Sequence, residues 1–108
     1  MTMCSVSAVR PLTPDASNDG HDRAAEVMKA CGSSVRLRML KIIASEDEIM
    51  VSELNKRIDL TQSALSQHLK VLRDADLVQT RRDSQRIYYS IKGDEVLTLL
   101  RSLKSLFG

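Results

Sequence analysis

The sequence predicts a mainly α-helical domain that carries one β-hairpin. Beyond residue 20, apolar side chains mostly recur at spacings of three and four, which is the period of amphipathic helices. The stretch 77–91 instead alternates and is rich in β-branched and aromatic residues, with a polar turn inside it. A length of 108 residues fits one domain. We expect it over 21–108, after a flexible arm over 1–20 that holds both prolines and no apolar period.

Two helices should open the domain. The first is predicted over about 22–30, and Gly32 ends it. A cap at Ser33 or Ser34 should begin the second helix, which we expect to be mostly buried. Its apolar stripe combines three residues with two that widen it: Leu37, Leu40 and Ala44, with Met39 and Ile43.

The next two helices should be joined by a tight turn. Residues 52–57 form a helix of barely two turns, and Asp59 and Leu60 break its period. Thr61 is well placed to cap a longer helix over 62–74. A connection of about four residues between two short helices is the spacing of a helix-turn-helix.

The longer of these helices carries an unusual polar face. Opposite its leucines stand amide and hydroxyl side chains and one lysine: Gln62, Ser63, Ser66, Gln67 and Lys70. An ordinary solvated helix favours Glu and Lys pairs instead. Gln and Ser side chains can donate hydrogen bonds to base edges and accept them, and they do not repel phosphates. This face therefore indicates a surface that recognises a DNA sequence. The alternative is an ordinary polar surface.

A basic hairpin should follow. Residues 77–82 and 86–91 are predicted strands, with 83–85 as the turn between them. Residues 61–92 hold six basic and three acidic side chains, which is the local excess that phosphate binding requires. A merely solvated basic face is the alternative. The arginines that flank the hairpin tip are Arg81, Arg82 and Arg86.

The last helix, over 94–107, has more apolar side chains than a small domain usually buries. They are Val96, Leu97, Leu99, Leu100, Leu103, Leu106 and Phe107. The surplus indicates a partner surface, most simply a second copy of the chain. The alternative is a helix that packs only on its own domain.

Several functional classes are excluded by the composition. No apolar run approaches the roughly 20 residues of a membrane span, and the first 20 residues lack the features of a signal peptide. We therefore expect a cytoplasmic protein with no membrane partner. We also expect no enzyme and no cofactor, because no Ser-His-acid set and no glycine-rich phosphate loop occur. Cys4 and Cys31 are too few for a disulfide scaffold.

These segments together resemble the winged-helix regulators of the ArsR/SmtB family. The resemblance covers everything after the arm and rests on TQSALSQHLKVLRDADLV at 61–78, RRDSQRIYY at 81–89 and CGSSVRLRML at 31–40. Within the family, SALSQHL at 63–69 and QRIYYSI at 85–91 look most like the subgroup around the haemolysin activator HlyU and the biofilm repressor BigR. The resemblance implies a winged helix-turn-helix with five helices, which dimerises through its first and last helices.

The resemblance also implies a function and its residues. It implies a homodimer that binds an imperfect inverted repeat in operator DNA, most simply as a repressor. The major groove would be contacted by Gln62, Ser63, Ser66 and Gln67. Near the backbone would lie His68, Lys70 and the wing arginines, with Thr61 and Arg73 completing the DNA-binding set. The dimer interface would comprise Val27, Met28, Val96, Leu99, Leu100, Leu103, Leu106 and Phe107.

His68 has two interpretations. An imidazole on a groove-facing helix could donate to a phosphate, yet His68 adjoins Leu69 and could equally be a partly packed structural residue.

The family's metal sites have no counterpart in this sequence. Metal-sensing relatives place a cysteine in an ELCVxDL motif, and here Met50 occupies that position in EIMVSEL. A second group of relatives binds zinc through the last helix, which here contains no histidine. A mixed set of Cys4, His21, Met50 and Glu53 can be imagined, but one member stands on the arm, and we expect no metal site.

The subgroup's redox pair is missing as well. It has one cysteine in the second helix and one at the end of the last helix, and the matching positions hold Lys41 and about Gly108. Cys31, one turn earlier, is the available substitute for a thiol-based regulator. Its alternative role is that of a small buried hydrophobic residue at a helix end.

Two details of shape and two questions of function stay open at this point. Asp76 and Ser84 replace glycines that relatives usually carry. Asp is tolerated in the left-handed conformation at a modest cost, so we expect the fold to be kept, with a wing tip that sits differently. The fold is also compatible with a module that binds another protein through its last helix and basic wing. The effector is not indicated by the sequence.

Overall fold

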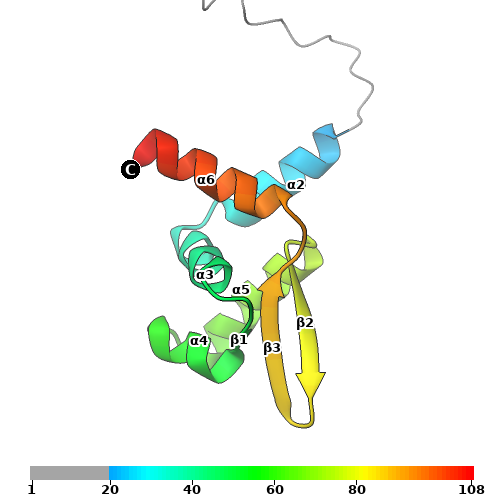
Figure 1. Ribbon diagram of the computed structural model, residues 1–108, viewed down its shortest axis with the longest axis vertical. Helices are drawn as coiled ribbons and strands as arrows, with labels where there is room; N and C mark the ends of the chain where they lie inside the picture. The colour runs from blue at the N-terminus through cyan, green and yellow to red at the C-terminus, as the bar shows by residue number, and fades with distance from the viewer. Residues whose placement is uncertain (1–19) are drawn as a thin grey trace, which may run out of the picture.

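A computed structural model of the chain describes residues 20–108, so the expected arm over 1–20 lies almost wholly outside the described residues. Within them the order is α2 (His21–Cys31), α3 (Ser34–Ala44), β1 (Ile49–Met50), α4 (Val51–Arg57), α5 (Gln62–Asp74), β2 (Val78–Asp83), β3 (Arg86–Ile91) and α6 (Glu95–Phe107). Five helices and a hairpin are therefore present in this part of the chain, as the sequence predicts. Figure 1 shows α2 and α6 at one end and the hairpin tip at the other.

Caps and glycines set the helix ends where the sequence places them. The Ser33 hydroxyl accepts a hydrogen bond from the Arg36 amide at 3.3 Å, which decides between the two candidate caps of α3. Thr61 caps α5 in the same way, through the Ala64 amide at 3.1 Å. Gly32 follows α2 and separates it from α3.

The sheet has three strands where the sequence indicated two. Its order is β1-β3-β2, with Ile49 opposite Tyr89 and Val78 opposite Ile91. The strand β1 was missed because two residues carry no readable period, and only the pairing with β3 makes them a strand. The first hairpin strand was placed one residue too early. Its loop has two residues rather than three, because Asp83 pairs with Arg86.

The core lies between the helices and one face of the sheet. It is built from apolar side chains of every helix and strand, among them Met39, Leu40, Ile43, Leu54, Leu65, Leu72, Leu77, Tyr89 and Val96. All five apolar residues of the predicted α3 stripe pack in or against the core. Met39, Leu40 and Ile43 are fully buried, and Leu37 and Ala44 are half-buried. α3 packs against α2, α4, α5 and β3, so it occupies the centre of the domain.

Both residues that stand at glycine positions of the family have left-handed backbone. Asp76 has φ 63° and Ser84 has φ 62°. Asp76 turns the chain from α5 into β2, and Ser84 is the first residue of the wing loop. Over residues 20–108, no helix has both the length and the apolar character needed to cross a membrane.

Candidate nucleic-acid interface

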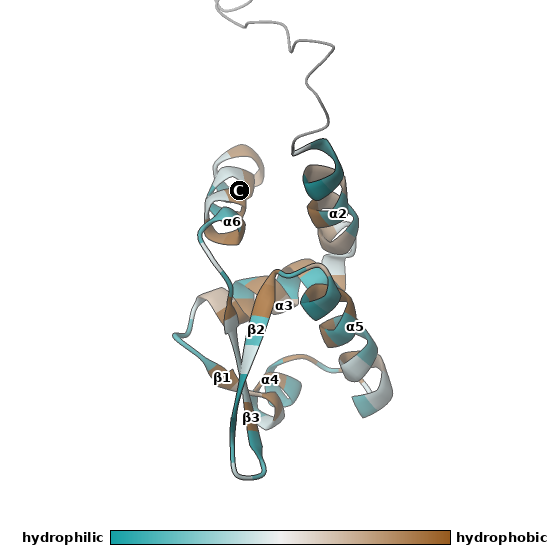
Figure 2. Cartoon of the chain, turned by 90° about the vertical axis from the view of Figure 1, so that its right-hand side faces the viewer, coloured by the Kyte–Doolittle hydropathy of each residue, from teal (hydrophilic) through white to brown (hydrophobic). Residues whose placement is uncertain are grey.

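The polar face of α5 is open to solvent. The leucines Leu65, Leu69 and Leu72 are buried and fix the orientation of the helix. The side chains opposite them are exposed, as is the cap: Thr61, Gln62, Ser63, Ser66, Gln67 and Lys70. α5 and the hairpin occupy the half of the molecule remote from α2 and α6 (Figure 2). The four amide and hydroxyl side chains are therefore available to base edges.

Three of the expected DNA-contacting basic residues have partners within the domain. Lys70 Nζ lies 2.7 Å from an Asp74 carboxylate oxygen. Arg73 donates to the Tyr89 hydroxyl at 3.2 Å. Arg81 donates to both carboxylate oxygens of one glutamate, Glu48, at 3.1 and 2.5 Å.

The Arg81 pair orients the wing. Its guanidinium also lies over the Tyr88 ring, 4.4 Å from the centroid. Hydrogen bonding with Glu48 raises the pKa of Arg81, and Arg81 in turn lowers the pKa of Glu48. Glu48 directly precedes β1, so the contact joins the wing to the sheet edge. No local pattern indicates this contact, because 33 positions separate the two residues.

Arg82 and Arg86 differ from Arg81. Both are exposed beside the wing loop, and neither forms an ion pair within residues 20–108. Asp83 pairs with Arg86 and Arg82 with Ile87, so the side chains of Arg82 and Arg86 point to opposite faces of the hairpin. Two unpaired guanidinium groups at the tip are the basic groups freest to contact phosphates.

His68 contacts Arg36 of the same chain. The Arg36 guanidinium lies 3.4 Å from His68 Nδ1, and His68 is half-buried. Arg36 also donates to the carbonyls of Ala30 at 2.6 Å and Lys29 at 3.4 Å. It thus joins the end of α2 to α5, and the geometry favours the structural interpretation of His68.

A second arginine makes a similar link that the sequence analysis missed. Arg23 of α2 binds Glu95 of α6 and Glu26, and donates to the carbonyls of Ala75 and Asp76. Its hydrogen bonds to the carboxylates of Glu95 and Glu26 raise the pKa of Arg23. These contacts hold α2, the end of α5 and the start of α6 together.

The candidate redox residue is buried. Cys31 is 9% exposed, and desolvation raises the pKa of its thiol although the Arg36 charge opposes the shift. Cys4 lies outside the described residues. Lys41 and Gly108, which stand where the resemblance puts the subgroup's cysteines, line the same groove between α3 and α6, and neither is a thiol.

Three of the four residues in the mixed set of candidate metal ligands lie within the described residues. His21 and Glu53 are exposed and Met50 is half-buried, on α2, α4 and β1 respectively. From residue 20 to residue 108, no group of three or more His, Cys, Asp or Glu side chains is placed to hold a metal ion.

The expected dimer residues divide into three groups by burial. Val96 and Leu100 are buried in the protomer, so these two side chains serve its own core. Met28, Leu106 and Phe107 are 70, 72 and 82% exposed. The remaining three are half-buried: Val27, Leu99 and Leu103.

Comparisons with known proteins agree with this geometry. A helix-turn-helix domain model matches residues 32–81. The chain is 42% identical over 100 residues to the nodulation protein NolR of Rhizobium meliloti, covering 93% of this chain and 80% of that protein. It is 38% identical over 85 residues to the transcriptional activator HlyU of Vibrio cholerae, covering 79% and 78%.

A solved structure supports the same assignment. It is the homodimeric winged helix-turn-helix DNA-binding domain of a possible ArsR-family transcriptional regulator from Mycobacterium bovis. It superposes with a TM-score of 0.75 at 27% identity, covering 90% of this chain and 89% of that one. The motifs, the fold and these similarities lead to one conclusion: the chain belongs to the ArsR/SmtB family of winged helix-turn-helix transcriptional regulators.

Proposed function

We propose that the protein is a cytoplasmic repressor that binds an imperfect inverted repeat in duplex DNA as a homodimer. The observation that carries the proposal is the exposed amide and hydroxyl face of α5, on the same half of the molecule as the unpaired wing arginines. Gln62, Ser63, Ser66 and Gln67 would read base edges in the major groove, and Arg82 and Arg86 would contact phosphates. Bound at a promoter, the dimer would exclude RNA polymerase.

Two further observations support a homodimer. α6 makes sparse contact with the rest of its own domain, while exposing Leu106. α2 exposes Met28 at the same end of the molecule. Apolar side chains this exposed at one end are typical of an interface, and a two-fold copy would cover both helices. The Mycobacterium bovis neighbour is homodimeric.

The test starts by selecting a binding site from a pool of duplexes with a random centre. Enriched sequences should contain an inverted repeat, and fluorescence anisotropy should give two protomers per site. The variant Ser63→Ala with Gln67→Ala should reduce discrimination between the selected and a scrambled duplex, roughly 10-fold or more. Arg86→Ala should instead weaken binding to both duplexes and lower the salt slope by about one.

A matched control tests whether the loss of discrimination is specific to α5. Ser102→Ala with Ser105→Ala removes two exposed hydroxyls from α6 and should leave discrimination unchanged. Equal discrimination by the α5 double variant and the wild type would contradict the assignment of the reading face. Failure to enrich any sequence would favour the module that binds another protein.

A further inference from the structure

A groove of about 830 Å³ lies between α3 and α6, at the end of the molecule away from the wing tip. Small-molecule sites in proteins commonly have volumes of about 300–1,000 Å³. The walls are mostly apolar, and their principal members are Leu37 and Ala44 of α3 with Leu97, Leu103 and Phe107 of α6. Size and lining suit a small molecule with an apolar body.

Positive charge is concentrated in this groove. It is lined by Lys41 of α3 and by Arg101 and Lys104 of α6, and by no acidic side chain. Within residues 20–108 none of the three forms an ion pair, whereas five basic side chains elsewhere do: Arg23, Arg57, Lys70, Arg81 and Lys92. Unpaired cations beside an apolar surface favour an anionic ligand.

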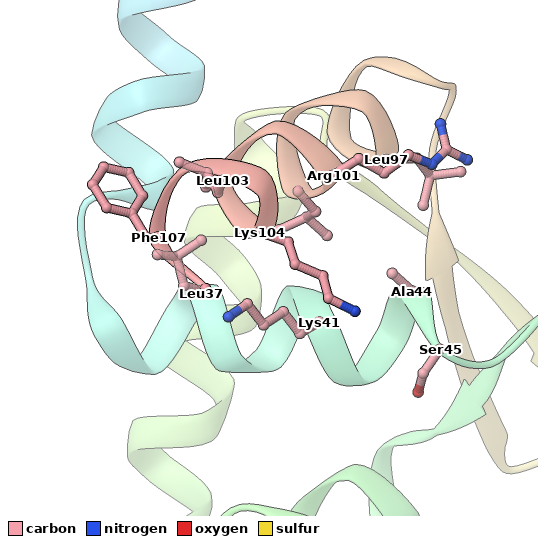
Figure 3. Close-up of a pocket in the computed structure, with 11 residues that line it drawn as sticks. Leu37, Lys41, Ala44, Ser45, Leu97, Arg101, Leu103, Lys104 and Phe107 are labelled. Carbon is pink, nitrogen blue, oxygen red and sulfur yellow. The ribbon is translucent and has the colours of Figure 1, made fainter.

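The arrangement of the charges limits the class of ligand further. Figure 3 shows Lys41 and Lys104 extending between the two helices, at the middle of the groove. Leu37 and Phe107 stand at one end, and Phe107 is 82% exposed. An anionic headgroup at the lysines would leave room for an apolar body along that end, which would cover the exposed ring.

Three residues of the expected dimer set line this groove: Leu100, Leu103 and Phe107. We assign these three to the groove and restrict the dimer surface of α6 to the side that carries Leu99 and Leu106. Leu97, which lines the groove, and Leu106, which does not, are nine residues apart. Nine residues correspond to about 2.5 helical turns, so these side chains point in opposite directions from the axis. A partner subunit seated on Leu106 therefore leaves the Leu97 side of the helix accessible.

We propose that this groove binds amphipathic carboxylates and thereby regulates the protein. The carboxylate would lie against Lys41 and Lys104, and the apolar body against Leu37 and Phe107. α3 forms one wall of the groove and packs on α5 and β3, so a shift of α3 reaches both DNA-contacting elements. The regulatory part rests on the proposed function, whereas the binding site does not.

Isothermal titration calorimetry of the full chain with four small probes tests the site without DNA. Decanoate has both the charge and the apolar body, 1-decanol lacks the charge, acetate lacks the body, and decyltrimethylammonium reverses the charge. Decanoate should bind saturably at one molecule per protomer. The affinity for 1-decanol should be at least threefold lower, and acetate and decyltrimethylammonium should show no saturable binding. Absence of saturable decanoate binding, or equal binding of 1-decanol, would overturn the proposal.

Charge-neutral variants place the binding in this groove. Lys41→Gln with Lys104→Gln should weaken decanoate binding roughly three- to tenfold. The control is Lys29→Gln with Lys56→Gln, which makes the same change in net charge at exposed positions that do not line the groove. Circular dichroism checks that both variants fold. Equal decanoate affinity of the two variants would place the ligand elsewhere and overturn the site.

The regulatory part has its own readout. Decanoate should change the affinity for the selected duplex at least threefold in the wild type and not in the Lys41→Gln, Lys104→Gln variant. Decanoate binding with unchanged DNA affinity would overturn the regulation and leave the site standing. A protein that binds no duplex at all would contradict the proposed function, while calorimetry would still decide the site.

Discussion

At the residue scale, the state of each basic side chain depends on the carboxylates that the fold brings beside it. Lys70 and Asp74 are four positions apart on one helix, so their pairing was readable from the sequence. Arg81 and Glu48 meet only because β1 joins the sheet next to the wing. Of the three wing arginines, one is thus engaged and two are free.

Glu48→Gln should raise the affinity for any duplex and steepen its salt dependence by about one unit of slope. The change removes a negative charge and frees Arg81 to contact a phosphate. Anisotropy titrations with an unrelated duplex at several salt concentrations measure both effects. Asp47→Asn is the control. It makes the same change in charge at the preceding residue, whose carboxylate has no ion pair in the described structure. Identical effects of both variants would show that net charge alone is responsible.

Burial should make Cys31 a slow nucleophile. Because the folded protein raises the pKa of this thiol, less thiolate is present at neutral pH than in a free cysteine. In a Cys4→Ser background, alkylation by iodoacetamide at pH 8 should be at least roughly 10-fold slower than for free cysteine. Its rate should also rise with pH along a curve displaced to higher pH. Alkylation as fast as that of free cysteine would restore Cys31 as a candidate sensor.

At the element scale, α5 was predictable and β1 was not. A threonine cap and three leucines at helical spacing lie within one short segment, so local information fixed both the bounds and the buried side of α5. β1 has only two residues and acquires its conformation from the partner strand. The predicted loop was one residue too long for the same reason, since pairing across the hairpin sets the register.

Thr61→Ala should lower the free energy of unfolding by about 1 kcal/mol. The hydroxyl satisfies the Ala64 amide at the start of α5, and its loss frays the turn that carries Gln62 and Ser63. Urea unfolding followed by circular dichroism measures the change. Thr98→Ala, at an exposed position inside α6, removes a hydroxyl that caps nothing and should cost far less. Equal losses would contradict a capping role for Thr61.

At the scale of the whole molecule, the proposed DNA-binding and dimer surfaces lie at opposite ends. The α5 face and the wing occupy one end, and α2 with α6 occupies the other. α3 lies between them and packs on elements of both halves. A dimer formed at the α2–α6 end would fix the spacing of two reading faces, so that DNA affinity and dimerisation should be coupled.

Leu106→Asp should shift the protein toward monomers and weaken binding to the selected duplex by roughly 10-fold or more. A charge at a position that a partner subunit would cover opposes association, while its 72% exposure in the protomer leaves the fold intact. Sedimentation velocity and anisotropy measure the two effects. Ser105→Asp places the same charge one residue earlier, at an exposed position that was polar already. A dimeric Leu106→Asp protein would contradict this interface.

The sequence by itself determined the family, the order and approximate bounds of most helices, the Thr61 cap and the polar face of α5. All of these depend on neighbours within one or two helical turns, where periodicity and short motifs are read directly. It also showed that Asp76 and Ser84 stand where relatives carry glycine, and the structure then showed left-handed backbone at both.

Only the tertiary structure decided what depends on residues that are distant in the chain. It paired Arg81 with Glu48, placed His68 beside Arg36, buried Val96 while exposing Leu106, and opened a basic groove between α3 and α6. A wide apolar stripe does not say which side faces the core, and a positive charge does not say whether a carboxylate lies nearby. Both follow from how separate elements pack, and that packing sets which side chains are free to bind a partner.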